Sequence, residues 1–317
     1  MKKVAIALAS LLALTGCAAQ EPTLVRVAAH DSFVISDELI SKFETDTGYE
    51  LEILRLGDTG SLTNQLVLTK NAPVADAVFG IDNTFEGVAT SAEIISGDLV
   101  AIDYSDVCFN YDIAWFEANA VTPPASWRDL TNESYRELTV ITNPNFSSPG
   151  LAFLASTQAG FATETEVRDY WLALKENGVK VAGSWEDAYF TDFTRYGGDR
   201  PIVLSYASSP SAEVLESGSA GTAALLEDCF RQTEFAGVLA GSANPAGAKA
   251  LVDFLLGDDF QRSVPEAMYV YPAVAGTEVP DAWAKFALPA TSTIGEDLDI
   301  NANRENWLAN WSEIFDN

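Results

Sequence analysis

The chain has 317 residues, of which 48% are hydrophobic, and its formal net charge at pH 7 is −28. This length and apolar content suit one large domain or two lobes. The excess of acidic groups argues against partners that carry negative charge, such as nucleic acids and anionic lipid surfaces, and weakly favours positively charged solutes. Solubility alone explains the acidity equally well.

The first residues are typical of an export signal. Lys2-Lys3 precedes an uncharged apolar run over residues 4–14, which is too short to span a membrane. The residues that follow, Leu14-Thr15-Gly16-Cys17, resemble the lipobox of bacterial lipoproteins, in which the cysteine is acylated.

We therefore expect a signal peptide over residues 1–16, lipidation of Cys17 and a short tether over residues 17–23. The lipid would hold the mature chain at the outer face of the cytoplasmic membrane, at the cell surface or in the periplasm. An ordinary secreted protein with a chance cysteine is the alternative interpretation.

Strand and helix patterns alternate in the next part of the chain. Strands are predicted over residues 24–28, 51–54 and 77–80, the last of them buried, and helices over residues 37–47 and 62–69. Gly48 is a stop signal for the first helix, and Asp58 lies in the turn that caps the second. This β-α-β-α-β order with short loops predicts an open α/β sheet.

The rest of the chain continues the α/β pattern. Two extended segments, residues 99–111 and 227–239, are candidates for crossings between two lobes. The other predicted strands span residues 138–141, 179–182 and 202–206, and the other predicted helices span residues 151–159, 167–177, 245–256 and 307–315. Ligands bind at the carboxyl ends of strands in open α/β sheets, so two such lobes would enclose a cleft.

Cys17 belongs to the expected anchor, which leaves Cys108 and Cys229. An even pair in an oxidising compartment favours a disulfide over two free buried thiols. Both cysteines lie in the segments assigned to the crossings and would be neighbours if both segments are hinge strands. The sequence contains no CxxC, and His30 is its only histidine, which argues against a zinc site or a Ser-His-Asp hydrolase.

Several short motifs recur in the order of a known family. They are His30-Asp31-Ser32-Phe33, Phe79-Gly80-Ile81-Asp82-Asn83, Ser148-Pro149-Gly150-Leu151, Trp185 with Ala188-Tyr189, Leu204-Ser205-Tyr206 with Ser209-Pro210, and Tyr271-Pro272. Together they resemble the solute-binding proteins of ABC importers, and within them the thiamine-binding branch, over about residues 24–316. The resemblance implies an α/β, two-lobe periplasmic binding protein fold of the type II kind, with a hinge of crossing strands and a cleft that closes on its ligand.

We expect lobe 1 to comprise residues 24–104 and 236–300, lobe 2 to comprise residues 105–235, and a C-terminal helix within residues 301–317 to pack on the lobes. The chain departs from the family pattern at two aromatic positions. His30 stands where the family commonly has tyrosine, and Tyr269 lies where it often has tryptophan.

Thiamine carries a cationic thiazolium ring, a flat aminopyrimidine and a hydroxyethyl tail, so its site needs aromatic faces, a carboxylate and hydrogen bonds. By resemblance, Trp185 and Tyr206 provide faces at strand ends, Ser205 and Ser208 offer hydroxyls, and Tyr269 completes the aromatic wall. The structural alternative for these aromatic residues is ordinary core packing.

The resemblance makes Asp58 the preferred partner of the aminopyrimidine or of the cation, with Asp82 as a second carboxylate and His30 as a partner of the tail. Capping and structural roles are the alternatives. Ser148 opens a helix in a candidate anion nest. No lysine or arginine lies within residues 139–165, so free thiamine, or at most its monophosphate, is expected.

The leading hypothesis is a monomeric receptor, with no cofactor, that delivers thiamine to an ABC permease. A receptor of the same fold for ferric iron, a polyamine or a phosphonate is the first alternative. A thiamine-degrading enzyme is the second, and it needs a reactive cysteine with an activating base. Pairing of Cys108 with Cys229 would remove that nucleophile, so enzyme activity is not expected.

Overall fold

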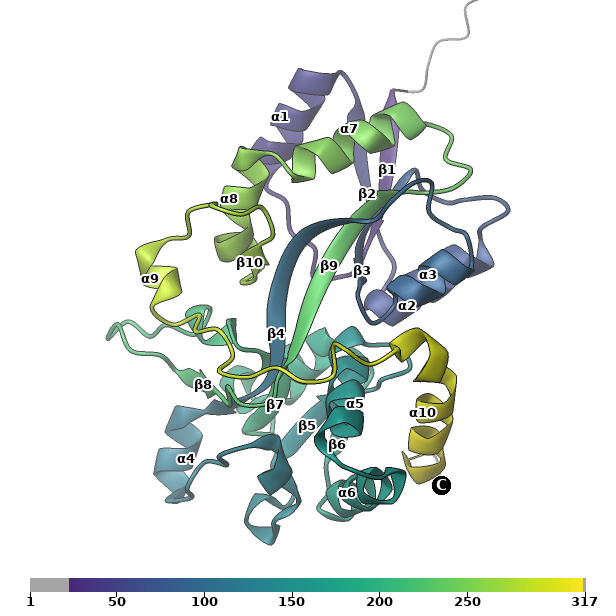
Figure 1. Ribbon diagram of the computed structural model, residues 1–317. Helices are drawn as coiled ribbons and strands as arrows, with labels where there is room; N and C mark the ends of the chain where they lie inside the picture. Colours follow the sequence, from purple (N-terminus) through teal and green to yellow (C-terminus); the bar gives the residue numbers. More distant parts are fainter. Residues whose placement is uncertain (1–22, 316–317) are drawn as a thin grey trace, which may run out of the picture.

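One sheet runs through the computed structural model, which describes residues 23–315 (Figure 1). The expected signal peptide, Cys17 and all but the last residue of the expected tether lie outside the described residues. The strands are β1 (Leu24–Ala29), β2 (Glu50–Arg55), β3 (Ala77–Asp82), β4 (Val100–Asp112), β5 (Thr139–Thr142), β6 (Lys180–Ala182), β7 (Ile202–Tyr206), β8 (Thr222–Ala224), β9 (Phe230–Val238) and β10 (Tyr271–Pro272).

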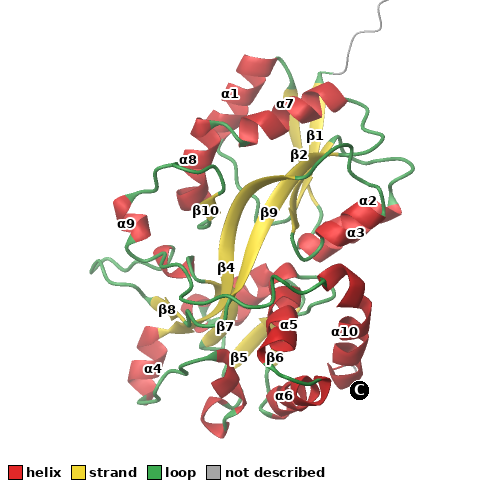
Figure 2. Ribbon diagram, viewed as in Figure 1, coloured by secondary structure: helices red, strands yellow, loops and turns green. Residues whose placement is uncertain are grey.

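Helices cover both faces of this sheet (Figure 2). They are α1 (Asp37–Thr47), α2 (Thr59–Leu68), α3 (Glu86–Ser91), α4 (Ile113–Asn119), α5 (Ser148–Gly160), α6 (Glu164–Glu176), α7 (Pro245–Leu255), α8 (Asp258–Ala267), α9 (Asp281–Ala284) and α10 (Ile300–Phe315). Short 3-10 helices and a π-helix, Asp187–Asp192, lie in the connections.

The strand order is β2-β1-β3-β9-β4-β7-β5-β6. The upper strands, β1 to β3, pair in parallel, and so do the lower strands, β5 to β7. The crossing strands, β4 and β9, are antiparallel to each other and to their outer neighbours, and they join the two groups (Figure 1). These strands are the two extended segments that the sequence analysis assigned to crossings.

Local signals define most elements where the sequence places them. Helix α1 has the predicted bounds: Ser36 accepts a hydrogen bond from the Leu39 N–H at its start, and Gly48, with φ of 76°, ends it in the left-handed conformation that glycine favours. Helix α8 is missing from the prediction. It contains Pro265, a residue that ordinarily interrupts a helical pattern.

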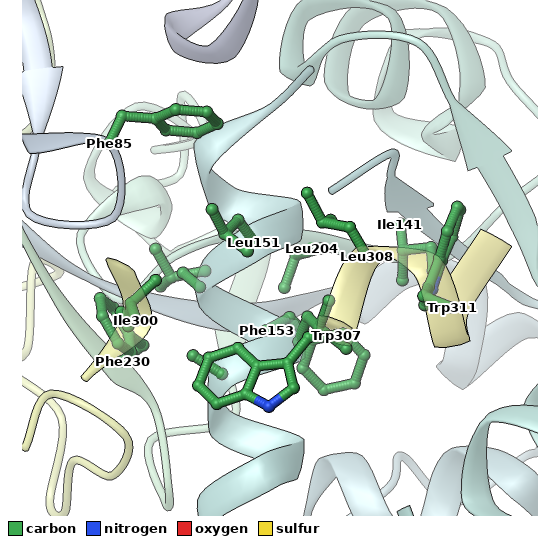
Figure 3. Close-up of a cluster of buried hydrophobic side chains, with 14 of the residues drawn as sticks. Phe85, Ile141, Leu151, Phe153, Leu204, Phe230, Ile300, Trp307, Leu308 and Trp311 are labelled. Atoms are coloured by element: carbon green, nitrogen blue, oxygen red, sulfur yellow. The ribbon is translucent and has the colours of Figure 1, made fainter. Parts of the chain in front are cut away.

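Two hydrophobic clusters fill opposite faces of the upper strands. Val27 and Phe79 pack with α1 and α7, whereas Ala28 and Val78 face the other way. The cluster that contains Ala28 and Val78 continues under the lower strands, where side chains of α5, β9 and α10 meet (Figure 3). Helix α10 packs on α6 of the lower half, with Trp311 edge-on to Trp171 at 6.2 Å between ring centroids, and it also contacts α3 of the upper half.

Helix α5 is buried on all sides over its first ten residues. Gly150 makes this possible, because a Cβ there would lie 2.4 Å from the carbonyl oxygen of Thr142. Within residues 23–315, no helix is both long enough and apolar enough to cross a membrane.

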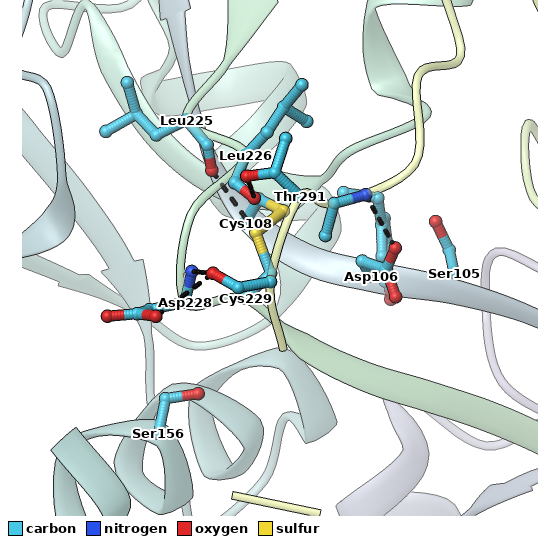
Figure 4. The surroundings of a disulfide bond; sticks show 12 residues. Ser105, Asp106, Cys108, Ser156, Leu225, Leu226, Asp228, Cys229 and Thr291 are labelled. Carbon is cyan, nitrogen blue, oxygen red and sulfur yellow. Dashed lines mark hydrogen bonds between the residues drawn. A yellow bond between two sulfur atoms is a disulfide. The ribbon is translucent and has the colours of Figure 1, made fainter. Parts of the chain in front are cut away.

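Cys108 of β4 and Cys229, which directly precedes β9, form a disulfide (Figure 4). Their Cα atoms are 4.9 Å apart, and the predicted pairing is confirmed. A third passage of the chain meets the two crossing strands here, because the N–H of Cys229 donates to the carbonyl of Ser292 at 3.1 Å. The disulfide thus lies where three passages of the chain come together.

Candidate functional site

A cavity with about 880 Å³ of empty space, including the open solvent at its mouth, lies beside the crossing strands. This is the size of a small-molecule site. Its lining comes mainly from strand-end loops of both groups, from the crossing strand β9 and from the segment after α8. The lining residues are His30, Ser32, Asp58, Thr59, Ser148, Trp185, Tyr189, Phe190, Tyr196, Tyr206, Ser209, Ala212, Glu234, Met268, Tyr269 and Val270.

The fold brings six of the nine predicted ligand-binding residues to the lining of this cavity. The six that line the cavity are His30, Asp58, Ser148, Trp185, Tyr206 and Tyr269. Asp82, Ser205 and Ser208 do not line it. The Ser205 hydroxyl accepts from the Trp185 indole, and the Ser208 hydroxyl lies 2.8 Å from that of Ser105. Ligand contact by any of these residues stays a prediction.

Aromatic rings form one wall of the cavity. The ring of Trp185 stacks on Tyr189, with centroids 5.0 Å apart and planes 24° apart, and lies 6.0 Å from the ring of Tyr206. Its Nε1–H donates to the Ser205 hydroxyl at 3.0 Å, which holds the indole in place. Phe190 meets the indole edge-on. Tyr189 and Phe190 follow Trp185 at helical spacing, a signal that the sequence analysis did not use for the wall.

Asp58 joins the two sides of the cavity. Its Oδ1 accepts from the Thr59 N–H at 2.8 Å, which caps α2, and its Oδ2 accepts from the Trp185 N–H at 3.0 Å. The Gly60 N–H also donates to the Phe146 carbonyl across the same gap, at 3.0 Å. Burial raises the pKa of the Asp58 carboxyl. The upper and lower strand-end loops are therefore in contact around the cavity.

Three carboxylates form a row across the crossing strands. In the strand register, Glu234 of β9 lies opposite Asp82 of β3 and also opposite Asp103 of β4, so the three side chains share a face of the sheet. All three are buried. Burial raises the pKa of Asp82 to about 7, and burial together with Glu234 raises that of Asp103 well above its usual value.

His30 lies against this row. Its Nε2 is 3.1 Å from Oε2 of Glu234. Burial lowers the pKa of His30, but Glu234 and the nearby aspartates outweigh burial and raise it above its usual value. Gly80 gives the imidazole its space, because a Cβ at that residue would lie 2.0 Å from the ring. Sequence reasoning did not single out Glu234, although an acidic residue within a predicted crossing strand is an unusual feature.

The raised pKa of Asp82 predicts an unusual dependence of stability on pH. Between about pH 4 and pH 7, this carboxyl holds its proton in the folded protein and has lost it in the unfolded chain. The Asp82 contribution to the free energy of unfolding therefore falls as pH rises through that window. Asp82→Asn keeps the oxygen that caps Thr84 and removes the titration. Relative to wild type, we expect the free energy of unfolding of this variant to gain about 3 kcal/mol from pH 4 to pH 7, measured by urea unfolding.

The exposed Asp37 provides the matched control, since Asp37→Asn removes the same charge without altering a buried group. Its stability should follow that of the wild-type protein across the window. Parallel curves for wild type and Asp82→Asn would contradict the prediction.

A family model described as bacterial extracellular solute-binding protein matches residues 76–291. The chain belongs to this family. The solute-binding protein is 29% identical to a thiamine-binding periplasmic protein of Escherichia coli (strain K12), over 95% of this chain and 96% of that relative. It is 25% identical to one of Brucella suis biovar 1 (strain 1330), over 98% of each.

Solved structures agree on the fold of the solute-binding protein. A periplasmic thiamin binding protein superposes with a TM-score of 0.80 at 24% identity, over 92% of this chain and 96% of that one. Iron-bound HitA from Pseudomonas aeruginosa gives a TM-score of 0.74 at 16% identity, over 92% and 99%. The α/β periplasmic binding protein fold expected from the motifs is confirmed, and the chain is an extracytoplasmic solute-binding receptor.

Proposed function

We propose that this receptor captures thiamine, or at most its monophosphate, and delivers it to an ABC import permease. The observation that carries the proposal is a cavity whose lining combines aromatic rings with the carboxylates of Asp58 and Glu234. The names of the relatives, thiamine-binding periplasmic proteins, support the same ligand.

The chemistry of the cavity suits a flat organic cation. Trp185, Tyr206 and Tyr269 offer ring faces, and a cation over such a face gains about 0.5–2 kcal/mol. Asp58 and Glu234 add negative charge, and the lining described in the structure includes no lysine or arginine. A pyrophosphate would therefore find no cationic side chain there, whereas a single phosphate has Ser148 at the start of α5.

Capture is proposed to close two lobes on the ligand by movement about the crossing strands. Lobe 1 would comprise residues 24–104 and 236–300, and lobe 2 residues 105–235, with the C-terminal helix packed on them. The lipid on Cys17 would keep this monomer near its permease at the outer face of the cytoplasmic membrane. The contacts of Asp58 with Trp185 and of Gly60 with Phe146 are the ones that closing would make.

Titration of the purified mature protein with thiamine tests the proposal. We expect saturable binding at micromolar ligand or below. Calorimetry measures this binding, and so does the quenching of tryptophan fluorescence as the ligand covers Trp185. Thiamine pyrophosphate should bind more weakly than thiamine. No heat and no fluorescence change at micromolar thiamine would contradict the proposed function, and release of the separated rings would identify an enzyme.

Ferric iron is the alternative to measure alongside, together with a polyamine and a phosphonate. Iron-binding tyrosines act as phenolates, and here the hydroxyls of Tyr189 and Tyr196 both donate to Glu213, at 3.0 and 2.8 Å. Burial and Glu213 raise the pKa of both phenols, which opposes their ionisation. We therefore expect no coloured complex with ferric citrate.

A further inference from the structure

Glu234 occupies the middle of β9, a crossing strand, and its side chain lines the cavity. The residue is 9% exposed. Oε2 faces His30 Nε2 at 3.1 Å, and Oε1 accepts from the Gln232 amide at 3.3 Å. Both partners are side chains, so no backbone hydrogen bond would be lost if the carboxylate took a new partner.

The neighbouring carboxylates are either held by backbone N–H groups or lie outside the cavity lining. Each oxygen of Asp58 accepts from a backbone N–H, one that caps α2 and one that holds Trp185. Oδ1 of Asp82 accepts from the N–H groups of Thr84 and Phe85, and Asp82 does not line the cavity. Asp103 is buried opposite Glu234 in the strand register and does not line the cavity either.

We propose that Glu234 is the residue that selects for positive charge in the ligand. The inference rests on the proposed function and names the group that would read the thiazolium charge. In the free cavity, the His30 imidazole is the partner of Glu234, at 3.1 Å. A bound cation takes over that role, in a buried setting where an opposite charge counts for more than in water. Asp82 and Asp103 lie on either side in the strand register, and burial raises the pKa of both carboxyls.

The test compares two ligands of one shape. Thiamine is the first, and the second is its neutral analogue, in which a thiophene ring replaces the thiazolium. Wild type should prefer thiamine, and Glu234→Gln should lose about 10- to 100-fold in affinity for thiamine while its affinity for the neutral analogue changes by less than about threefold. A role confined to folding would change both affinities together.

Two matched variants complete the design. Asp103→Asn removes a buried carboxyl next to Glu234 without altering the lining, and we expect it to keep the wild-type preference. Asp58→Asn disturbs the cap of α2 and the position of Trp185, so it should weaken both ligands alike. Should Glu234→Gln fail to fold, Glu234→Asp withdraws the carboxylate by one methylene, and it should lower the preference for thiamine.

The outcomes separate the two proposals. A wild-type protein that binds neither ligand contradicts the proposed function, and the inference falls with it. A wild-type protein that prefers thiamine, with the same preference in Glu234→Gln or Glu234→Asp, contradicts the inference alone. If Asp58→Asn loses affinity for thiamine but not for the neutral analogue, charge selection belongs to Asp58. That result would also overturn the inference.

Discussion

Replacing Trp185 by alanine is expected to lower the affinity for thiamine by roughly 100-fold. The indole supplies the largest ring face of the cavity wall, and Trp is the strongest partner of a cation among the aromatic side chains. Its loss would also free Tyr189, on which it stacks, and the hydroxyl of Ser205, to which its N–H donates. Calorimetric titration of wild type and variant measures the difference.

One further variant separates the ring face from the hydrogen bond of the indole, and a second serves as a control. Trp185→Phe keeps an aromatic face and loses the hydrogen bond to Ser205, so we expect an intermediate loss of about tenfold. Trp115 of α4 does not line the cavity, and Trp115→Ala should bind thiamine as wild type does. An affinity within about twofold of wild type for Trp185→Ala would show that another group recognises the rings.

Replacing both Cys108 and Cys229 by serine is expected to lower the melting temperature by about 10 °C. The disulfide closes a loop with a sequence separation of 121 residues. By the chain-entropy model, opening such a loop removes roughly 4 kcal/mol of stability, because the unfolded chain gains freedom. Thermal unfolding of the oxidised wild type and of the double variant measures the loss.

Binding provides the control for this variant. Neither cysteine lines the cavity, so thiamine affinity should stay within about twofold of wild type. Wild type treated with a reductant should unfold near the temperature of the double variant. A large loss of affinity at an unchanged melting temperature would mean that the disulfide acts on the site and not on the unfolded chain.

The elements that sequence reasoning found are those with a strong local pattern. Helix α1 begins after a capping serine, ends at a glycine and has an apolar face, so no distant contact is needed to define it. Helix α8 has Pro265 within it, and its Phe260 and Val264 are buried against residues far away in the chain. Its helical state depends on that packing, which the local pattern does not reveal.

At the site, too, residues with a local motif were found from the sequence and residues placed by distant pairing were not. Trp185 and Tyr206 were recognised from motifs at strand ends, and the structure places both in the cavity wall. Glu234 has no motif around it. It enters the site because β9 pairs with β3 and β4 in a register that sets Asp82 and Asp103 opposite it.

By itself, the sequence determined the α/β class, most of the strands and helices, the two crossing segments and the available cysteines. Periodicity, caps and residue counts suffice for these, because each depends on neighbours within a few residues. Only the tertiary structure decided that Asp58 touches Trp185, and that three carboxylates and His30 share one buried row. These groups come from distant parts of the chain, and the register that unites them is set by burial of whole strands and not by any local signal.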